Sequence, residues 1–326
     1  MPSIPLAIGV SDSDRMRPLV DRQVTIVGVE PTIEVMPVQA LFNRQLTRHV
    51  FDCCEFPLTS YIRTLEQATK PYLAVPVFPS RHFRLSCVFV HAGSRIAKPA
   101  DLAGKRVGIP VFDMAAAVWL RGIFHEHYGL DRVSPIYVTG GLEDARRGDE
   151  HPQVFPEKFR IERVTDRSLA ELLDRGGIDA LYTARAPSTW PSANVHRMFA
   201  DPIAAELAYF AETGVFPPMH VIAVKRPLAD RHPRLASSLF DAFAAAQRIA
   251  QAKLSDSAAL GVMLPWLLEH LLFTEQKLGQ DYWPVGFAKN RATLATIIRY
   301  MVDDGLTTTL FSPEDLFAGA DDLLST

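Results

Sequence analysis

The hydrophobic positions of the chain follow two different periods. Short apolar runs predict buried strands, whereas apolar residues at three- and four-residue spacing predict helices. The first pattern predicts strands at 5–10, 24–29, 32–35, 51–55, 85–90, 134–138, 178–182 and 216–224. The second predicts helices at 38–49, 112–119, 169–177, 233–253, 258–278 and 291–302, and a last helix that begins after Ser312. Because strands and helices alternate, we expect an α/β protein.

Polar residues beside the predicted strands supply candidate ligand groups. The stretch 78–84, with the sequence FPSRHFR, precedes the strand at 85–90. Arg81 and Arg84 each offer a planar fork of donors that matches a carboxylate, and Ser80 adds a hydroxyl. His82 can transfer a proton near neutral pH. The stretch is therefore predicted to bind a small polyanion, and the alternative is a basic turn on a solvated edge.

Loops beyond other predicted strands carry further candidates, because ligands often bind at strand ends in α/β proteins. These candidates are Arg15, Ser60, Gly140, Arg185 and Ser188. The helix at 112–119, with Asp113 as its expected N-cap, would present its first-turn amides near Ala115 to a carboxylate. Each candidate also has a structural explanation, since arginines form ion pairs and serines cap helices.

Size and charge narrow the class of protein. The chain has 326 residues, which is more than one hydrophobic core usually serves, so we predict two lobes. Hydrophobic residues make up 48% of the chain and can fill both cores. A net charge of −3 argues against nucleic acid and anionic membranes as partners. The first residues lack a secretory pattern, and polar residues interrupt the apolar stretch 258–273, so we predict a cytoplasmic protein without a membrane span. The three cysteines are predicted to be buried free thiols.

Several short motifs occur in order along nearly the whole chain. They are SDR at 13–15 with RPL at 17–19, FPSR at 78–81 with FR at 83–84, AAVW at 116–119, TGGL at 139–142, ARAPS at 184–188, FP at 216–217 with MH at 219–220, and YWP at 282–284. Together they resemble the 4,5-dihydroxyphthalate decarboxylase family. The segment 98–110 also resembles the start of the second lobe in type II periplasmic-binding-protein folds.

The resemblance implies a fold and a reaction. It implies a two-lobed type II periplasmic-binding-protein-like fold, with a ligand cleft between the lobes and extra C-terminal helices. Lobe I would comprise 1–88 and 222–326, and lobe II would be the inserted segment 89–221. The family converts 4,5-dihydroxyphthalate to protocatechuate with release of carbon dioxide. Because Cys53, Cys54 and Pro57 depart from the expected pattern, a relative that acts on another hydroxylated aromatic acid is the alternative.

The implied reaction assigns roles to the candidate residues. A hydroxyl para to the departing carboxylate directs electron density to the ring carbon, so no organic cofactor is needed. Arg81, Arg84, Arg15 and Arg185 would clamp the dianion, and Ser60 and Ser188 would bind ring hydroxyls. Trp119 and Trp283 would stack on the ring, although large aromatics often fill cores. His220 is the expected proton donor with His82 in reserve, and the alternative for His220 is a hydrogen-bonded core residue.

The sequence leaves open a metal site, the oligomeric state and two other classes of protein. A divalent metal is left open, although no spaced ligand set is visible and His125 and His127 do not face each other on a helix. The expected partner is a small aromatic dicarboxylate, and a homo-oligomer is left open. The second hypothesis is a solute-binding protein that delivers an aromatic carboxylate to a transporter. His220 and the absence of an export signal favour the enzyme over that protein. A thiamine-precursor synthesis protein of the same fold is the weaker third hypothesis, because the sequence shows no histidine- and cysteine-rich site of the kind that such proteins use.

Overall fold

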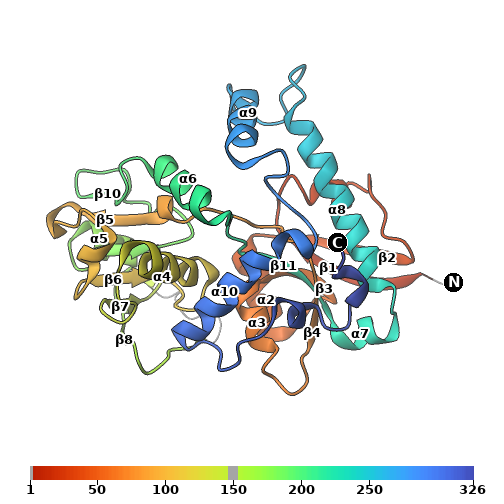
Figure 1. Ribbon diagram of the computed structural model, residues 1–326, viewed down its shortest axis with the longest axis horizontal. Coiled ribbons are helices and arrows are strands. Elements are labelled where there is room, and N and C mark those ends of the chain that lie inside the picture. Colours follow the sequence, from red (N-terminus) through yellow and green to blue (C-terminus); the bar gives the residue numbers. More distant parts are fainter. Residues whose placement is uncertain (1–2, 146–152) are drawn as a thin grey trace. The chain divides into compact units, whose positions relative to one another are not determined.

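The computed structural model describes residues 3–145 and 153–326 and divides the chain into two units (Figure 1). Unit 1 comprises Met1–Arg81, Pro218–Leu294 and Phe311–Thr326, and unit 2 comprises His82–Pro217 and Ala295–Leu310. The sequence boundaries at 88/89 and 221/222 differ from this division. Residues 82–88 fall in unit 2, where Phe83 stacks on Phe216 and Arg84 contacts Cys87. Residues 295–310 also belong to unit 2 rather than to the first lobe.

Within the described residues, the sheet of unit 1 has the strand order β2-β1-β3-β11-β4. Its strands are β1 (Ile4–Val10), β2 (Val29–Val35), β3 (Cys53–Pro57), β4 (Tyr72–Val75) and β11 (His220–Lys225). β1 is parallel to β2 and β3, whereas β11 is antiparallel to both β3 and β4. The carboxyl ends of β1, β2, β3 and β4 therefore lie at the same edge as the amino end of β11.

The helices of unit 1 cover this sheet. They are α1 (Arg17–Val20), α2 (Val38–Arg48), α3 (Leu58–Thr64), α7 (Arg226–Arg231), α8 (Leu235–Leu254) and α9 (Leu267–Leu278). Short 3-10 helices occur at Ala288–Asn290, Pro313–Phe317 and Asp321–Leu323. Alternate residues Leu6 and Ile8 of β1 and Ile222 of β11 share a core with Leu239 and Phe243 of α8. Burial of this apolar surface is the main favourable contribution to folding of the unit.

Some predicted elements of unit 1 differ in the structure. β2 runs through Pro31, although the sequence predicted a break there, because β2 is an edge strand and pairs only with β1. α9 begins at Leu267 rather than at 258, since Pro265 lies just before it and cannot continue a helix. The last predicted helix is a 3-10 helix, and Ser312 caps it as expected.

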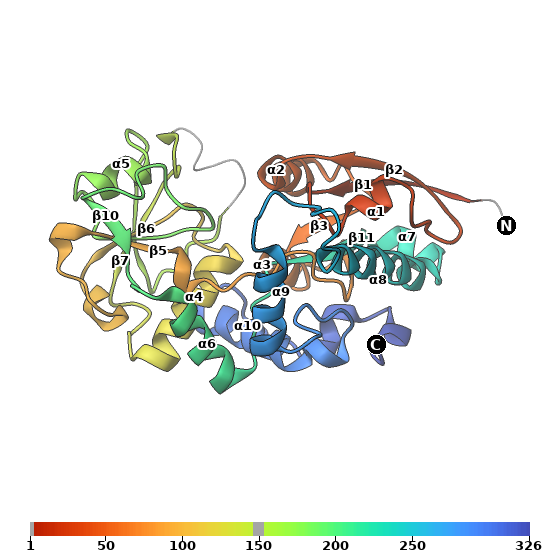
Figure 2. The same cartoon turned by 90° about the horizontal axis from the view of Figure 1, so that it is seen from above.

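Within the described residues, the sheet of unit 2 has the strand order β10-β5-β9-β6-β7-β8. Its strands are β5 (Val88–His91), β6 (Arg106–Ile109), β7 (Ile136–Thr139), β8 (Arg160–Arg163), β9 (Ala180–Tyr182) and β10 (Val195–Arg197). Strands β6 to β9 are parallel, and β5 is antiparallel to β9 and β10. Figure 2 shows α5 on one side of this sheet and α4 on the other. An α/β unit with two covered faces results.

The helices of unit 2 are α4 (Ala115–Tyr128), α5 (Leu169–Asp174) and α6 (Pro202–Thr213). Short 3-10 helices occur at Leu85–Cys87, Ala92–Ser94 and Pro99–Leu102. The N-cap of α4 is Met114 rather than Asp113, and the Met114 side chain makes no cap hydrogen bond. The predicted loop at 143–157 includes 146–152, which lie outside the described residues.

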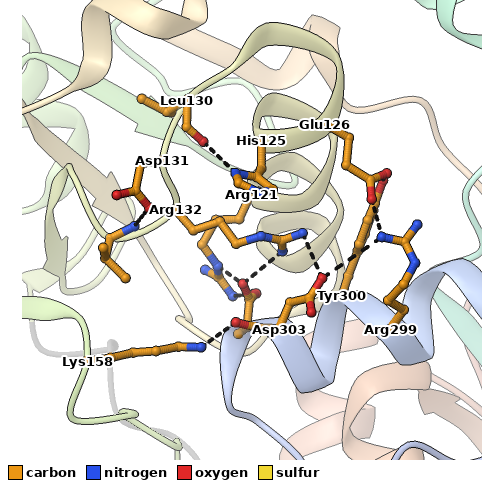
Figure 3. Close-up of polar contacts among 12 residues, drawn as sticks. Arg121, His125, Glu126, Leu130, Asp131, Arg132, Lys158, Arg299, Tyr300 and Asp303 are labelled. Atoms are coloured by element: carbon orange, nitrogen blue, oxygen red, sulfur yellow. Dashed lines mark hydrogen bonds and ion pairs between the residues drawn. The ribbon is translucent and has the colours of Figure 1, made fainter.

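A buried ion network attaches the end of α10 (Arg291–Asp304) to unit 2. Arg121 Nε donates to Asp304 Oδ2 over 2.8 Å, and Arg132 donates to Asp304 Oδ1 over 3.2 Å. Figure 3 shows the neighbouring contacts, in which Tyr300 hydroxyl donates to Glu126. Gly122 allows this approach, because a Cβ at that position would collide with the Tyr300 ring. The network explains why residues 295–310 belong to unit 2.

Two further sequence predictions can be compared with the structure. Cys53, Cys54 and Cys87 are free and buried, which confirms the prediction of buried thiols. Burial raises the pKa of the Cys53 and Cys54 thiols. Among the described helices, none is both long and apolar enough to span a bilayer.

Candidate active site

A pocket of about 500 Å³ lies within unit 1. Its polar lining comes from the loop 11–15 after β1, from Glu55 of β3, from Ser80 and from His220 of β11. Residues 35–38, at the end of β2 and the start of α2, supply the apolar lining. These segments meet because the carboxyl ends of β1 and β2 lie at the same sheet edge as the amino end of β11. A ligand site at that edge is typical of α/β sheets.

The strand register brings Glu55 and His220 together. In the antiparallel β3–β11 pair, Glu55 lies opposite Ile222, and His220 lies opposite Pro57. Because side chains two residues apart on a strand share a face, Glu55 and His220 become diagonal neighbours on one face of the sheet. Glu55 Oε1 lies 2.6 Å from His220 Nδ1. The phenyl ring of Phe42 packs edge-on against the imidazole, with 4.8 Å between ring centroids.

The Glu55 carboxylate is a buried charge that neighbouring donors stabilise. Its residue is only 1% exposed, yet Ser11 donates to Oε2 from both its backbone N–H and its hydroxyl. Burial alone would raise the pKa of Glu55, but the contacts with His220 and Ser11 outweigh it and hold that pKa below its usual value. Glu55 is therefore ionised at neutral pH and accepts a hydrogen bond from His220 Nδ1. Among the described residues, Nε2 of the imidazole has no hydrogen-bond partner.

Arg15 supplies the positive charge of the pocket. Its Nε donates to the Pro79 carbonyl, its NH1 pairs with Asp14 over 3.0 Å, and its guanidinium lies 5.0 Å from the centroid of the Trp283 ring. The Ser13 hydroxyl oxygen in the same loop is buried and lacks a hydrogen-bond partner among the described residues. A cation beside an unsatisfied hydroxyl is suited to an anionic oxygen of a ligand.

Of the residues predicted from sequence, the structure brings Arg15, Ser80 and His220 together in this pocket. The Ser80 carbonyl accepts from the Met219 N–H over 2.7 Å, so Ser80 is held beside the strand that carries His220. Trp283 is attached to the same unit, because its indole N–H donates to the Phe78 carbonyl over 3.0 Å. Ser60 lies partly buried in α3 and does not line the pocket.

Arg81 differs from the sequence prediction of a ligand clamp. Its guanidinium is buried and bonds to the Pro284 carbonyl over 3.0 Å and to Asn290 Oδ1, and it does not line the pocket. Burial lowers the pKa of Arg81 to about 9, which still leaves a positive charge at neutral pH. The sequence shows only that an arginine lies next to a predicted strand. This pattern does not distinguish an arginine that binds a ligand from one that bonds to other residues of the protein.

The other predicted residues belong to unit 2 and are described within it. Arg84 is buried, bonds to the Ala184 carbonyl over 3.3 Å and contacts Cys87, and its burial lowers the pKa of the guanidinium. His82 is exposed and contacts the Phe83 carbonyl through Nδ1. Arg185 is exposed, and its backbone N–H donates to Thr183.

Four further residues of unit 2 were predicted from the sequence: Ser188, Trp119, Ala115 and Gly140. The Ser188 hydroxyl and N–H bond to the Glu143 carboxylate. Trp119 is fully buried in α4 against Tyr300, which is a core position rather than a stacking surface. Ala115 is the first residue of α4. A Cβ on Gly140 would meet the Val164 carbonyl oxygen at 2.9 Å, so the glycine is required for close packing of the chain.

Sequence reasoning missed Glu55 and Ser11. Glu55 stands between apolar residues in a predicted buried strand, and a carboxylate there is a signal, since ionised groups are rarely buried without a partner. Its partner His220 could not be identified without the strand pairing. Among the described residues, no three His, Cys, Asp or Glu side chains are grouped to hold a metal ion.

Comparison with solved structures defines the class of fold. The chain resembles the periplasmic aliphatic sulphonate binding protein SsuA from Escherichia coli, with a TM-score of 0.56 and 14% identity over 100% of both chains. It also resembles a protein from Archaeoglobus fulgidus, with a TM-score of 0.55 and 12% identity over 93% of this chain and 98% of that chain. The fold is therefore periplasmic-binding-protein-like, as predicted.

Comparison with curated sequences defines the family. The chain is 36% identical over 320 residues to the 4,5-dihydroxyphthalate decarboxylase of Comamonas testosteroni, and the match covers 97% of each chain. It is 35% identical over 205 residues to the Pseudomonas putida protein of the same name, covering 62% of this chain and 80% of that protein. No family model matches the chain. The chain belongs to the 4,5-dihydroxyphthalate decarboxylase family.

Proposed function

We propose that this chain is a carboxy-lyase that converts 4,5-dihydroxyphthalate to protocatechuate and carbon dioxide. Two curated relatives carry the name of this activity. Within the structure, the observation that supports the proposal most strongly is the His220–Glu55 pair beside Arg15 in the pocket of unit 1. In this proposal, His220 is the proton donor and Arg15 is the cation that binds the substrate.

The substrate itself accommodates much of the charge that develops during the reaction. Each carboxylate of 4,5-dihydroxyphthalate has a hydroxyl para to it. As that hydroxyl is polarised, electron density moves to the ring carbon that carries the carboxylate. The protein must then orient the dianion, deliver a proton to that carbon and exclude water.

His220 is the proton donor in this proposal. With Nδ1 hydrogen-bonded to Glu55, the protonated imidazole presents Nε2–H for transfer. The proton goes from Nε2 to the ring carbon, the bond from that carbon to the carboxylate breaks, and its electron pair restores the aromatic ring as carbon dioxide leaves. The imidazole then regains a proton from water. One proton is consumed for each carbon dioxide released.

Glu55 acts on this step through His220. An ionised carboxylate at Nδ1 fixes the tautomer and orientation of the ring. The hydrogen bonds from Ser11 keep Glu55 in place and ionised. Glu55 is therefore a positioning residue, and His220 is the catalytic residue.

Arg15 and the neighbouring hydroxyls bind the substrate in this proposal. The Arg15 guanidinium can attract a carboxylate of the dianion, and the buried Ser13 hydroxyl can donate to it. Ser80 lines the same pocket and offers a second hydroxyl. Because Arg15 also contacts Trp283 and Pro79, its position is fixed before the ligand arrives. Such preorganisation lowers the entropy cost of binding.

The test is incubation of purified, chelator-treated protein with 4,5-dihydroxyphthalate, with carbon dioxide and protocatechuate measured together. We expect equal amounts of the two products. Phthalate, which lacks both hydroxyls, is the matched control and should not react. If 4,5-dihydroxyphthalate raises the melting temperature but no carbon dioxide forms, with or without added divalent metal, the proposal is wrong and ligand binding alone is the function.

A further inference from the structure

An exposed apolar segment lies between α8 and α9, continues into α9 and is not part of the pocket lining. We call residues 262–273 the apolar arm. Met263 is 103% exposed and Trp266 is 66% exposed, and both precede α9. Leu272 and Phe273, within α9, are 54% and 41% exposed. Elsewhere, exposed large apolar residues such as Val27 stand singly, so this arm differs from ordinary surface.

Helix α9 has two faces with different surroundings. Leu267 is buried and Leu271 is partly buried, and the helix contacts α8. The opposite face, at positions 269, 272, 273, 276 and 277, is exposed. A surface helix usually places polar residues on its solvent face, but here Leu272 and Phe273 occupy the middle of that face. The inner face of α9 therefore packs within unit 1. The outer face carries the exposed apolar residues Leu272 and Phe273.

The exposed area of the arm fits one side of a stable interface. From their exposed fractions, six side chains together present roughly 700 Å², whereas a standard protein interface buries roughly 800 Å² per partner. These side chains are Val262, Met263, Leu264, Trp266, Leu272 and Phe273. The largest apolar patch on a typical monomer is roughly 300–600 Å². The arm alone thus supplies most of the apolar area that a dimer needs.

Two residues of opposite charge, Glu269 and Lys277, lie on the outer face of α9 at equal distances in sequence from Phe273. Glu269 lies four residues before Phe273, and Lys277 lies four residues after it. Both are exposed on the same face as Phe273. In an antiparallel pair of α9 helices with a two-fold axis at Phe273, each Glu269 lies opposite Lys277 of the other copy. A two-fold interface requires this kind of self-complementarity.

We propose that the apolar arm pairs with the apolar arm of a second copy of this chain, with the two α9 helices antiparallel. The apolar side chains form the centre of the interface, and the two Glu269–Lys277 pairs form its rim and set its register. This inference rests on α9 and its surroundings, and it holds whether or not the proposed reaction is correct.

Light scattering during size-exclusion chromatography tests the pairing. The wild-type chain should have a mass of at least twice 36.2 kDa at micromolar concentration. The double variant Leu272→Asp, Phe273→Asp should have half of the wild-type mass. Val27→Asp, which changes an exposed apolar residue of the same unit, is the matched control and should keep the wild-type mass. Circular dichroism and melting temperature establish that each variant is folded.

Charge reversal tests the register. Glu269→Lys should raise the dimer dissociation constant about tenfold, because it places like charges opposite each other across the axis. Adding Lys277→Glu to that variant should restore the wild-type constant. A wild-type mass of 36.2 kDa at every concentration overturns the proposal. An unchanged mass in the double aspartate variant also overturns it, and failure of the charge reversal to restore pairing overturns the antiparallel register.

Discussion

Glu55 Oε1 and His220 Nδ1 lie 2.6 Å apart on one face of the β3–β11 pair, although 165 positions separate them in the sequence. The register of two antiparallel strands is sufficient to create this contact. It combines a group that is ionised at neutral pH with an imidazole at the edge of a pocket. The proposed chemistry depends on this contact.

Replacement of the Glu55 carboxylate should slow the reaction without weakening binding. Glu55→Gln keeps the size of the side chain but removes the carboxylate that orients the imidazole of His220. We expect kcat to fall by about 10–100-fold with KM changed little, since second-layer contacts of a reacting histidine have effects of this size. Steady-state kinetics of both proteins measure the two parameters.

Glu30→Gln is the matched control for this prediction, because Glu30 is exposed on the edge strand of the same unit. It should leave both kcat and KM unchanged. A folded Glu55→Gln variant with the wild-type kcat would show that Glu55 has only a structural role.

The Glu55 carboxylate should also stabilise the fold in a pH-dependent way. Its pKa in the folded protein is lowered from the ordinary 4.5, so its contribution is present above that value and is lost as the pH falls through the lower folded pKa. At neutral pH, Glu55→Gln should reduce the free energy of unfolding by about 1–3 kcal/mol. The difference should shrink at acid pH. Urea unfolding of both proteins over this range measures it, and a difference independent of pH contradicts the assignment.

Arg15 should determine substrate affinity. Arg15→Gln removes the cation of the pocket, and we expect KM for 4,5-dihydroxyphthalate to rise by about 10-fold or more. Arg15→Lys should recover only part of this loss, because an ammonium group lacks the planar fork of donors. Arg231→Gln is the control, since Arg231 is exposed on α7 of the same unit and its Nε donates to the Pro227 carbonyl over 3.0 Å, outside the pocket lining. Equal KM values for the two glutamine variants would exclude Arg15 as a specific ligand.

Asp304 should be the critical member of the ion network in unit 2. Its carboxylate is fully buried between Arg121 and Arg132. Asp304→Asn leaves the buried Arg121 guanidinium without its anion and leaves Arg132 paired only with Asp303, so we expect a loss of about 3–5 kcal/mol in the free energy of unfolding. Asp303→Asn should cost only about 0–1 kcal/mol, because that carboxylate is 42% exposed. Chemical denaturation measures both, and equal losses would contradict this account of the network.

The sequence predicted the α/β class, the periplasmic-binding-protein-like fold and the family. It also placed Arg15, Ser80 and His220 among the candidates that the structure brings into one pocket. Local patterns could not separate them from Arg81, because an arginine that binds the Pro284 carbonyl and Asn290 has the same sequence context as one that binds a ligand. Partners in distant segments decide that difference.

Contacts between segments far apart in the sequence also explain the other differences between the sequence predictions and the structure. Pro31 suggested a break, but edge position in the sheet allows a proline within β2. Residues 295–310 looked like part of the C-terminal helices of the first lobe, yet Asp304 pairs with Arg121 and Arg132 of unit 2. Glu55 was overlooked because its partner lies on a strand that returns much later in the chain.

The central claim is that His220 transfers the proton after the substrate has bound. The most direct measurement compares wild type and His220→Asn for binding of 4,5-dihydroxyphthalate by calorimetry and for carbon dioxide release in a single turnover. We expect the variant to bind with a dissociation constant close to that of the wild type and to release carbon dioxide about 10²–10⁴-fold more slowly. Carbon dioxide release at the wild-type rate by a folded His220→Asn variant would contradict the account.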